Sequence, residues 1–465
     1  MNQDPAIKKY TLITVMVASF STPFMGSAIN LAIPTIGREF NSNALLLSWV
    51  VSSYLLATAA FLLPFGRLAD IAGRKKIFML GVIIFTLSSL LCGAAWSVQS
   101  LIGFRVLQGI GSSMTFGTGM AILTSVFPPQ ERGRVLGFNV ATVYTGLSLG
   151  PVLGGAMNQH LGWESIFFLN TAIGLATYLF ATRIKGEWAD ARGESFDKTG
   201  SVLYMFGLVA FLYAFSSIAT SVWAKYILFF GLVLLVLFVR QEMKCRHPLI
   251  NISLFKENVT FALSNLAALI NYSATFAITF LLSMYLQVVM EYSSQAAGMI
   301  LLSQPVMMAL LSPFAGSLSD RVEPRIVSSW GMGLTALGLF FLGFIARSTP
   351  LWLVIINLMV LGTGFALFSS PNMNAIMGSV EKRFYGVASS TSGTMRLIGQ
   401  AVSVAIATLI IDLYVGSAQL GPATADLLQK SVNVAFIVFA VTCVGGIFAS
   451  LARGNINTGA RQAGK

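Results

Sequence analysis

Long apolar runs, separated by short polar joints, follow one another along almost the whole chain. Each run holds roughly 20 residues, the length that an α-helix needs to cross the hydrocarbon core of a bilayer. The pattern therefore predicts an all-α integral membrane protein with 14 transmembrane spans. The expected spans cover residues 11–33, 46–66, 77–97, 99–125, 135–158, 163–182, 199–219, 223–242, 260–286, 295–316, 326–346, 350–371, 385–412 and 432–452.

The composition supports a bilayer environment. Hydrophobic residues make up 55% of the chain and charged residues only 10%, whereas soluble domains carry about 25% charged residues. So few charges cannot cover a water-soluble globule of 465 residues. The three cysteines and two histidines are scattered, so we expect no disulfide framework, no metal site, no cofactor and no enzymatic activity.

The basic residues are distributed unequally between alternate joints. With the N-terminus in the cytoplasm, 23 of the 29 Lys and Arg residues lie in inner joints and tails, and only four lie in outer joints. Because membranes retain Lys and Arg on the cytoplasmic side, this asymmetry predicts a multi-pass protein with both termini in the cytoplasm. Topology thus accounts for the net charge of +12, and we expect no nucleic-acid partner.

Two charged joints flank one pair of spans and divide the chain into three parts. We predict an N-terminal six-helix bundle over residues 1–185 and a C-terminal six-helix bundle over 246–465. A charged joint and two inserted transmembrane helices occupy 186–245. The later bundle repeats features of the earlier one at an offset of about 250 residues, an arrangement in which a substrate site forms between repeats near the membrane midplane.

The joint after the second span carries the first candidate motif, formed by Gly66, Asp70, Gly73 and Arg74, with Asp320 at the equivalent place in the later half. The glycines allow close backbone contact or a positive φ, and an Asp can pair with an Arg or a helix end. We predict a conformational role for these residues. The alternative is an ordinary basic loop that only anchors the topology.

Small residues form a stripe along the predicted fifth span. Gly146, Gly150 and Gly154 recur every four residues, with Pro151 and Gly155 beside them. Residues four apart lie about 40° apart around a helix, so a neighbouring helix can lie against this stripe. Because Pro151 bends the helix, we predict a hinge or a fixed kink, and a plain packing face is the alternative.

Two arginines, Arg105 and Arg396, lie inside predicted spans, and Gln108 shares a helix face with Arg105. A guanidinium within a span costs at least about 2.5–3.5 kcal/mol and is therefore a functional candidate. An Arg held by backbone carbonyls for structure is the alternative. The other candidate substrate contacts are polar residues inside spans, namely Asn30, Tyr54, Tyr144, Asn271 and Asn374.

These stretches resemble the motifs of the major facilitator superfamily. The joint at 66–76 is similar to its cytoplasmic loop motif, residues 105–111 to its arginine motif, and residues 146–155 to the motif typical of its antiporters. With fourteen spans, the chain resembles the drug:proton antiporter (multidrug efflux) branch. The resemblance implies two six-helix bundles plus two extra helices, a role for Arg105 in substrate or proton handling, and a role for the stripe in alternating access.

One departure from that branch concerns proton coupling. Family members commonly carry an acid in the first span where this chain has Met25, and all 17 Asp and Glu residues lie in joints, in tails or near span ends. Two interpretations therefore stay open for a protein that we expect to be a monomer in the plasma membrane. One is export of amphipathic, drug-like small molecules, with proton antiport undecided. The other is uniport or exchange of an organic anion or metabolite, which the in-span arginines favour.

Overall fold

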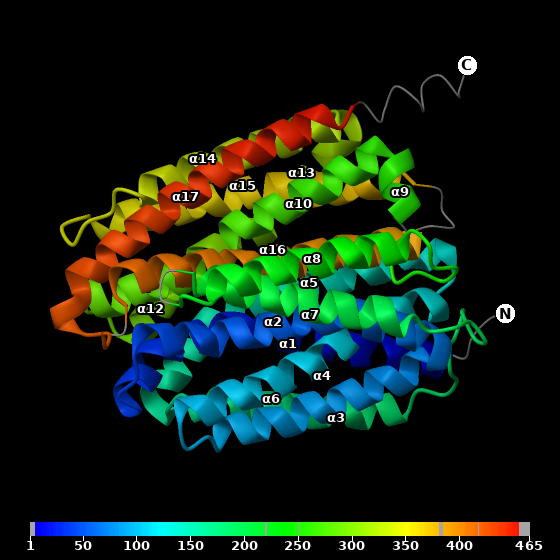
Figure 1. Cartoon of the computed structure of the whole chain (residues 1–465), viewed down its shortest axis with the longest axis horizontal. Coiled ribbons are helices and arrows are strands. Elements are labelled where there is room, and N and C mark those ends of the chain that lie inside the picture. Colours follow the sequence, from blue (N-terminus) through cyan, green and yellow to red (C-terminus); the bar gives the residue numbers. More distant parts are fainter. Residues whose placement is uncertain (1–4, 219–220, 251, 381–384, 417, 455–465) are drawn as a thin grey trace. The chain divides into compact units, whose positions relative to one another are not determined.

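The computed structural model describes residues 5–218, 221–250, 252–380, 385–416 and 418–454, and helices make up nearly all of these ranges (Figure 1). The chain divides into two compact units. Unit 1 comprises Met1–Ile250, Tyr292–Met299 and Gly416–Leu420, and unit 2 comprises Asn251–Glu291, Ile300–Val415 and Gly421–Lys465.

The long helices of unit 1 are α1 (Pro5–Glu39), α2 (Ala44–Ala72), α3 (Arg74–Gly93), α4 (Val98–Val126), α5 (Pro129–Leu161), α6 (Glu164–Thr182), α7 (Lys198–Ser216) and α8 (Ala224–Glu242). α5 packs along α1, α4 packs against both α2 and α3, and α6 packs against α3 (Figure 1). The two helices of the predicted insert, α7 and α8, pack on each other, and α7 also packs on α2. The insert therefore groups with the N-terminal helices, and the predicted division into three domains stays a prediction.

Unit 2 contains α9 (Ile252–Glu257), α10 (Val259–Thr275), α11 (Ile278–Met284), the π-helical turn η1 (Tyr285–Val289), α13 (Ser303–Arg321), α14 (Pro324–Leu342), α15 (Leu351–Gly378), α16 (Tyr385–Tyr414), the 3₁₀ turn η3 (Pro422–Thr424) and α17 (Ala425–Ala452). α13 and α14 pack on α15, while α10 packs on α16 and α17. α12 (Ser294–Leu301) begins in the short segment that belongs to unit 1.

Side-chain caps define several helix starts. Asn43 Oδ1 accepts a hydrogen bond from the Leu46 amide at 2.8 Å, and Ser97 forms a capping box at the start of α4. Asn258 Oδ1 accepts one from the Phe261 amide at 2.8 Å. Such caps satisfy amides that have no partner within the first helical turn. Accordingly, α2, α4 and α10 begin within two residues of the predicted starts at 46, 99 and 260.

The span predicted at 260–286 is interrupted. α10 ends at Thr275, α11 begins at Ile278, and η1 follows directly. At the interruption, the Ala277 amide donates a hydrogen bond to Ser403 Oγ of α16 at 3.0 Å. Backbone donors in an apolar environment must be satisfied inside the protein, and this side chain from another helix does so.

Twelve helices of the described residues are long and apolar enough to cross a membrane, so the protein is an all-helical, multi-pass membrane protein. The predicted count of fourteen spans is not confirmed, because α4 and α5 are not among the twelve. Both are long, with 29 and 33 residues. They bury polar side chains, Arg105 and Gln108 on α4 and Asn139 and Asn158 on α5, and such residues reduce the apolar character of an internal helix.

The outer faces of several helices carry large apolar side chains. Phe229 and Phe230 of α8 are 70% and 57% exposed, and Leu87 of α3 is 57% exposed. Apolar surface of this extent is unfavourable in water and is stable against lipid. We therefore assign these faces to the contact with the bilayer.

Candidate functional site

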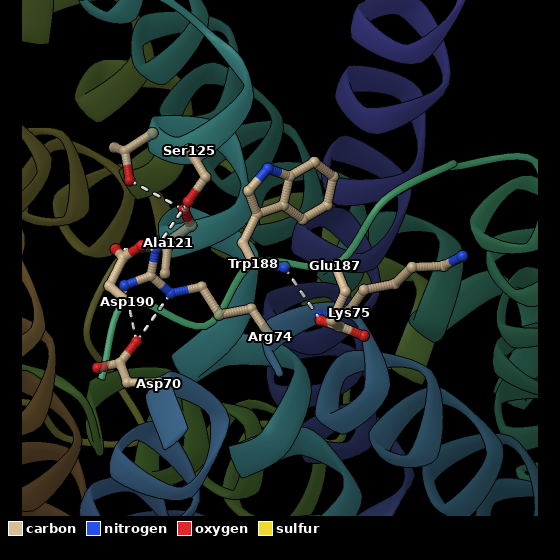
Figure 2. Close-up of polar contacts among 9 residues, drawn as sticks. Asp70, Arg74, Lys75, Ala121, Ser125, Glu187, Trp188 and Asp190 are labelled. Carbon is tan, nitrogen blue, oxygen red and sulfur yellow. Dashed lines mark hydrogen bonds and ion pairs between the residues drawn. The ribbon is translucent and has the colours of Figure 1, made fainter. Parts of the chain in front are cut away.

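An ion-pair cluster occupies the joint between α2 and α3 (Figure 2). Arg74 Nε donates a hydrogen bond to Asp70 Oδ1 at 2.8 Å, and Arg74 Nη1 lies 2.8 Å from Asp190 Oδ2. The same guanidinium donates to Ser125 Oγ of α4 at 2.7 Å. Figure 2 shows it lying between the two carboxylates and the hydroxyl. One side chain thereby links α2, α3, α4 and the joint that precedes α7.

That joint folds back over the α2–α3 turn. The amides of Lys75 and Lys76 donate hydrogen bonds to the Glu187 carboxylate at 2.8 and 3.2 Å, so this acid caps the N-terminus of α3. Gly73 has a φ of +123°, and a Cβ at this position would lie 2.6 Å from Glu187 Cδ. A glycine is therefore needed here both for its backbone conformation and for the space that Glu187 occupies. Gly66 lies one turn before Asp70 in α2.

The glycine stripe of α5 faces α1. A Cβ at Gly154 would lie 2.6 Å from the Cβ of Ala28, and a Cβ at Gly150 would collide with Ser27 Oγ. Gly146 lies equally close to the backbone of α1. Because no side chain of the stripe separates the two helices, their backbones approach closely, as at other small-residue helix contacts.

Pro151 and Gly155, the other two members of the α5 motif, contact the segment at 292–299. A Cβ at Gly155 would collide with the carbonyl oxygen of Ser294, whose hydroxyl donates to the Gly155 carbonyl at 3.1 Å. A Cβ at Gly298 would likewise collide with the carbonyl of Pro151. α5 therefore has two close-packed faces within unit 1.

Arg105 lies at the centre of a buried cluster on α4. Its Nε donates to the Val50 carbonyl of α2 at 3.0 Å, and its Nη1 donates to Gln108 Oε1 at 2.5 Å. The guanidinium carbon lies 4.2 Å from the centre of the Tyr54 ring, within the range of a cation–π contact. Gln108 Nε2 donates in turn to Ser89 Oγ of α3 at 2.7 Å. The fold thus brings three predicted residues together, namely Arg105, Gln108 and Tyr54, and they join α2, α3 and α4.

The remaining predicted substrate contacts lie on other helices. In unit 1, Asn30 is buried in α1 and donates to the Gly26 carbonyl at 3.1 Å, and Tyr144 is half-buried on α5. In unit 2, Asn374 is exposed on α15 and Arg396 is half-buried on α16. Asn271 of α10 is fully buried, and neither atom of its amide group has a hydrogen-bond partner among the described residues. Asp320 lies in α13, but its side chain is outside the described part of the structure.

Sequence reasoning missed a second buried arginine, because Arg453 was counted among the bases of the C-terminal tail. It is 1% exposed at the end of α17. Its Nη1 donates to Asn372 Oδ1 of α15 at 2.5 Å and its Nη2 to Ser328 Oγ of α14 at 3.0 Å. Burial lowers the pKa of its guanidinium to about 10, so Arg453 remains charged at neutral pH. The only sign of this contact in the sequence was the presence of Ser328 and Asn372, two polar residues in an apolar region to which no role had been assigned.

A family model matches most of this chain. It describes the Major Facilitator Superfamily and covers residues 15–243 and 265–461. The chain belongs to the Major Facilitator Superfamily. It is therefore a membrane transporter acting on small molecules, and its family consists of transporters rather than enzymes.

Curated relatives within the superfamily cover most of the chain. The riboflavin transporter RibZ of Clostridioides difficile (strain 630) is 32% identical over 399 residues, 86% of this chain and 87% of the relative. The multidrug resistance protein Stp of Mycobacterium tuberculosis (strain ATCC 25618 / H37Rv) is 30% identical over 92% of this chain and 81% of its own length. Multidrug resistance protein 3 of Bacillus subtilis (strain 168) is 29% identical over 85% and 77%.

A solved structure supports the fold. A bacterial homolog of the human lysosomal transporter Spinster, crystallised in an inward-facing and unoccupied conformation, aligns with a TM-score of 0.68 over 97% of each chain. The two sequences are 16% identical, so this likeness concerns the fold alone. The predicted major facilitator fold is thereby confirmed, without the count of fourteen spans.

Proposed function

We propose that this transporter exports amphipathic or aromatic small molecules across the plasma membrane by alternating access. The observation that carries the proposal is the close approach of α1 and α5 along Gly146, Gly150 and Gly154. Two helices packed without intervening side chains can slide or rock against each other while staying in contact. Two of the relatives described above are named as multidrug resistance proteins, which supports amphipathic cargo.

We further propose that α4 and α5 cross the membrane with the other twelve helices, giving fourteen spans and cytoplasmic termini. At 29 and 33 residues, both exceed the length needed to span a bilayer. α4 packs against α2 and α3, and α5 packs along α1, and all three partners are among the twelve apolar helices. Arg105 and Gln108 of α4 and Asn139 and Asn158 of α5 are buried and so face protein rather than lipid, which is compatible with a membrane position.

In this proposal the predicted polar residues have different tasks. Arg105 orients Tyr54 and fixes α4 to its neighbours, while Asn30, Tyr144, Asn271, Asn374 and Arg396 contact the substrate in the course of transport. The loop motif of Gly66, Asp70, Gly73, Arg74 and Asp320 stabilises one conformation through ion pairs, as the contact of Arg74 with Asp70 and Asp190 suggests. Proton antiport would need a titratable group at another position, since the Met25 thioether cannot bind a proton at neutral pH.

The second candidate is a metabolite transporter that works by uniport or exchange. It is favoured by the 32% identity to a protein named as a riboflavin transporter. Riboflavin combines an aromatic ring system with a polar side chain. The substrates of the two candidates therefore differ in charge more than in shape, and the two transporters differ in coupling.

Counterflow in proteoliposomes distinguishes the two candidates. Vesicles loaded with unlabelled substrate are diluted into labelled ethidium or labelled riboflavin, and uptake is compared with empty vesicles. The first candidate predicts ethidium counterflow, and the second predicts riboflavin counterflow without it. Absence of counterflow for both probes and for a wider panel of organic cations and anions would contradict the proposal.

A further inference from the structure

Two acidic side chains are buried together in unit 1, at the start of α7 and the end of α8. Asp197, the N-cap of α7, is 8% exposed, and Glu242, the last residue of α8, is 3% exposed. A Cβ at Gly200 would lie 2.6 Å from both Asp197 Oδ2 and Glu242 Oε1, so the two oxygens flank the same point. The glycine leaves the space between the carboxylates open.

The hydrogen bonds of this pair leave one oxygen unsatisfied. Asp197 Oδ1 accepts from the Gly200 amide at 2.8 Å, and Glu242 Oε2 accepts from the Ile250 amide at 3.0 Å. The Leu249 amide is a second backbone donor to the Glu242 carboxylate. Gln241 Nε2 also donates to the Asp197 carboxylate, at 3.3 Å. Glu242 Oε1 is buried and has no hydrogen-bond partner among the described residues. An ionised oxygen without a donor is costly to bury, whereas a protonated one can donate to Asp197.

The charges around the pair are unbalanced. The cation that acts on Glu242 is Arg67 of α2, but its guanidinium already pairs with Glu194, which also contacts His247 Nδ1 at 2.9 Å. The Cys245 thiol hydrogen-bonds to Asp197 and brings no positive charge. In the described part of the chain, neither Asp197 nor Glu242 has an ion-pair partner, and no three His, Cys, Asp or Glu residues are grouped to hold a metal.

We propose that Asp197 and Glu242 form a proton-binding site in which Glu242 Oε1 holds the proton and faces the Asp197 carboxylate across the space left by Gly200. Two buried carboxylates that flank the same point favour retention of a proton, here by Glu242, whose Oε1 has no donor among the described residues. Sequence reasoning missed this site, since Asp197 falls in a charged joint and Glu242 is the last residue of the span predicted at 223–242. The site provides a titratable pair in a chain that has Met25 in place of a first-span acid.

The position of the pair connects it with the loop motif. When the proton leaves, the pair gains a second negative charge that attracts Arg67, which lies one residue after Gly66 in the last two turns of α2. Arg67 then divides its interaction between this pair and Glu194 of the joint. Binding and release of the proton therefore shift the α2–α3 turn between two arrangements. This step rests on the proposed transport function, whereas the existence of the proton site does not.

Infrared difference spectroscopy on the purified protein tests the site itself. At neutral pH the wild type should show the carbonyl stretch of a protonated carboxyl group, and Glu242→Gln should lose it. The matched control Glu257→Gln, an exposed acid on α9, should keep it. In Asp197→Asn, which retains a good N-cap, the band should persist only to a lower pH, because the like charge is gone.

Three results would overturn the proposal. One is the absence of the band in the wild type at neutral pH, and another is an unchanged band in both Glu242→Gln and Asp197→Asn. The third is removal of the band by magnesium or calcium at constant pH, which would make the pair a cation site.

Proteoliposomes test the link with transport. An imposed pH gradient should change the rate of substrate movement in the wild type and in Glu257→Gln, and this response should be lost in Glu242→Gln. An undiminished response in Glu242→Gln would contradict a role of the pair in coupling. Lack of any transport by the wild type would instead contradict the proposed function, and the infrared result would still decide the proton site.

Discussion

Arg105 is a buried cation whose described contacts are neutral groups. A carbonyl from α2, the amide of Gln108 and the ring of Tyr54 surround it, and carbonyl and aromatic groups of this kind stabilise a guanidinium inside a membrane. The sequence predicted that Arg105 and Gln108 share a face, because they are three residues apart on one helix. The contacts with Val50 and Tyr54 could not be predicted, because they depend on how α2 packs against α4.

We expect Arg105→Lys to abolish most transport. A lysine keeps the charge but cannot bond to the Val50 carbonyl and Gln108 while lying flat against Tyr54, and each lost charged hydrogen bond is worth about 1.5–3 kcal/mol. The measurement is initial uptake per molecule of folded protein, with Arg38→Lys as the exposed control. Wild-type uptake in Arg105→Lys would show that charge alone suffices.

The reactivity of the Cys245 thiol depends on the acidic groups at the C-terminal end of α8. Burial, and with it the neighbouring carboxylate of Asp197, raises the pKa of the Cys245 thiol, so less thiolate is present at neutral pH. We predict slow maleimide labelling at neutral pH, faster labelling as the pH rises, and faster labelling at a given pH in Asp197→Asn. Cys92 and Cys443 are fully buried and should contribute little. Equal rates in wild type and Asp197→Asn would mean that Asp197 does not influence the thiol.

The contact of α5 with α1 is the clearest feature at the level of elements. Four-residue spacing predicted a smooth stripe on the fifth span, and the stripe is present. The sequence did not indicate which helix would cover it, nor that Gly155 and Pro151 would face a different segment at 292–299. Such partners are set by tertiary packing, which a periodic pattern on a single helix does not encode.

We predict that Gly150→Leu retains expression but loses transport. Overpacking a tight contact costs about 1–3 kcal/mol, and here the added side chain would push α5 away from Ser27 of α1. The control is Gly103→Leu on α4, where an added Cβ meets no atom within 4 Å. Transport of a counterflow substrate by both variants is the measurement, and equal activity would remove the α1–α5 contact from the mechanism.

Across the whole molecule, apolar periodicity predicts the helices but misses buried charges at their ends. Membrane-length helices follow from the apolar runs, although α1, α5 and α17 begin well before the predicted starts at 11, 135 and 432. The motifs at 66–76 and 146–155 led to the correct superfamily. Burial of Asp197, Glu242 and Arg453 was missed, because charges in joints, in tails and at the ends of spans are normally solvated. Only the folding of the joints onto the helix ends removes these three side chains from water.

Topology is tested by labelling single cysteines in a variant that lacks the native three. We predict that Ser195→Cys, in the joint before α7, reacts with a membrane-impermeant maleimide only from the cytoplasmic side, because 23 of 29 bases lie in joints assigned to that side. Ala94→Cys, after α3, should react only from outside. Labelling of both positions from the same side would contradict the proposed arrangement of spans.

Proton-coupled export by this protein can be followed as concentrative movement of substrate in proteoliposomes. The purified protein is reconstituted, a pH gradient is imposed, and the substrate identified by counterflow is followed across the membrane. We expect accumulation above the external concentration that collapses when a proton ionophore is added and is absent in Gly150→Leu. Movement that only equilibrates the substrate, with or without the gradient, would contradict proton-coupled export and leave the uniport candidate.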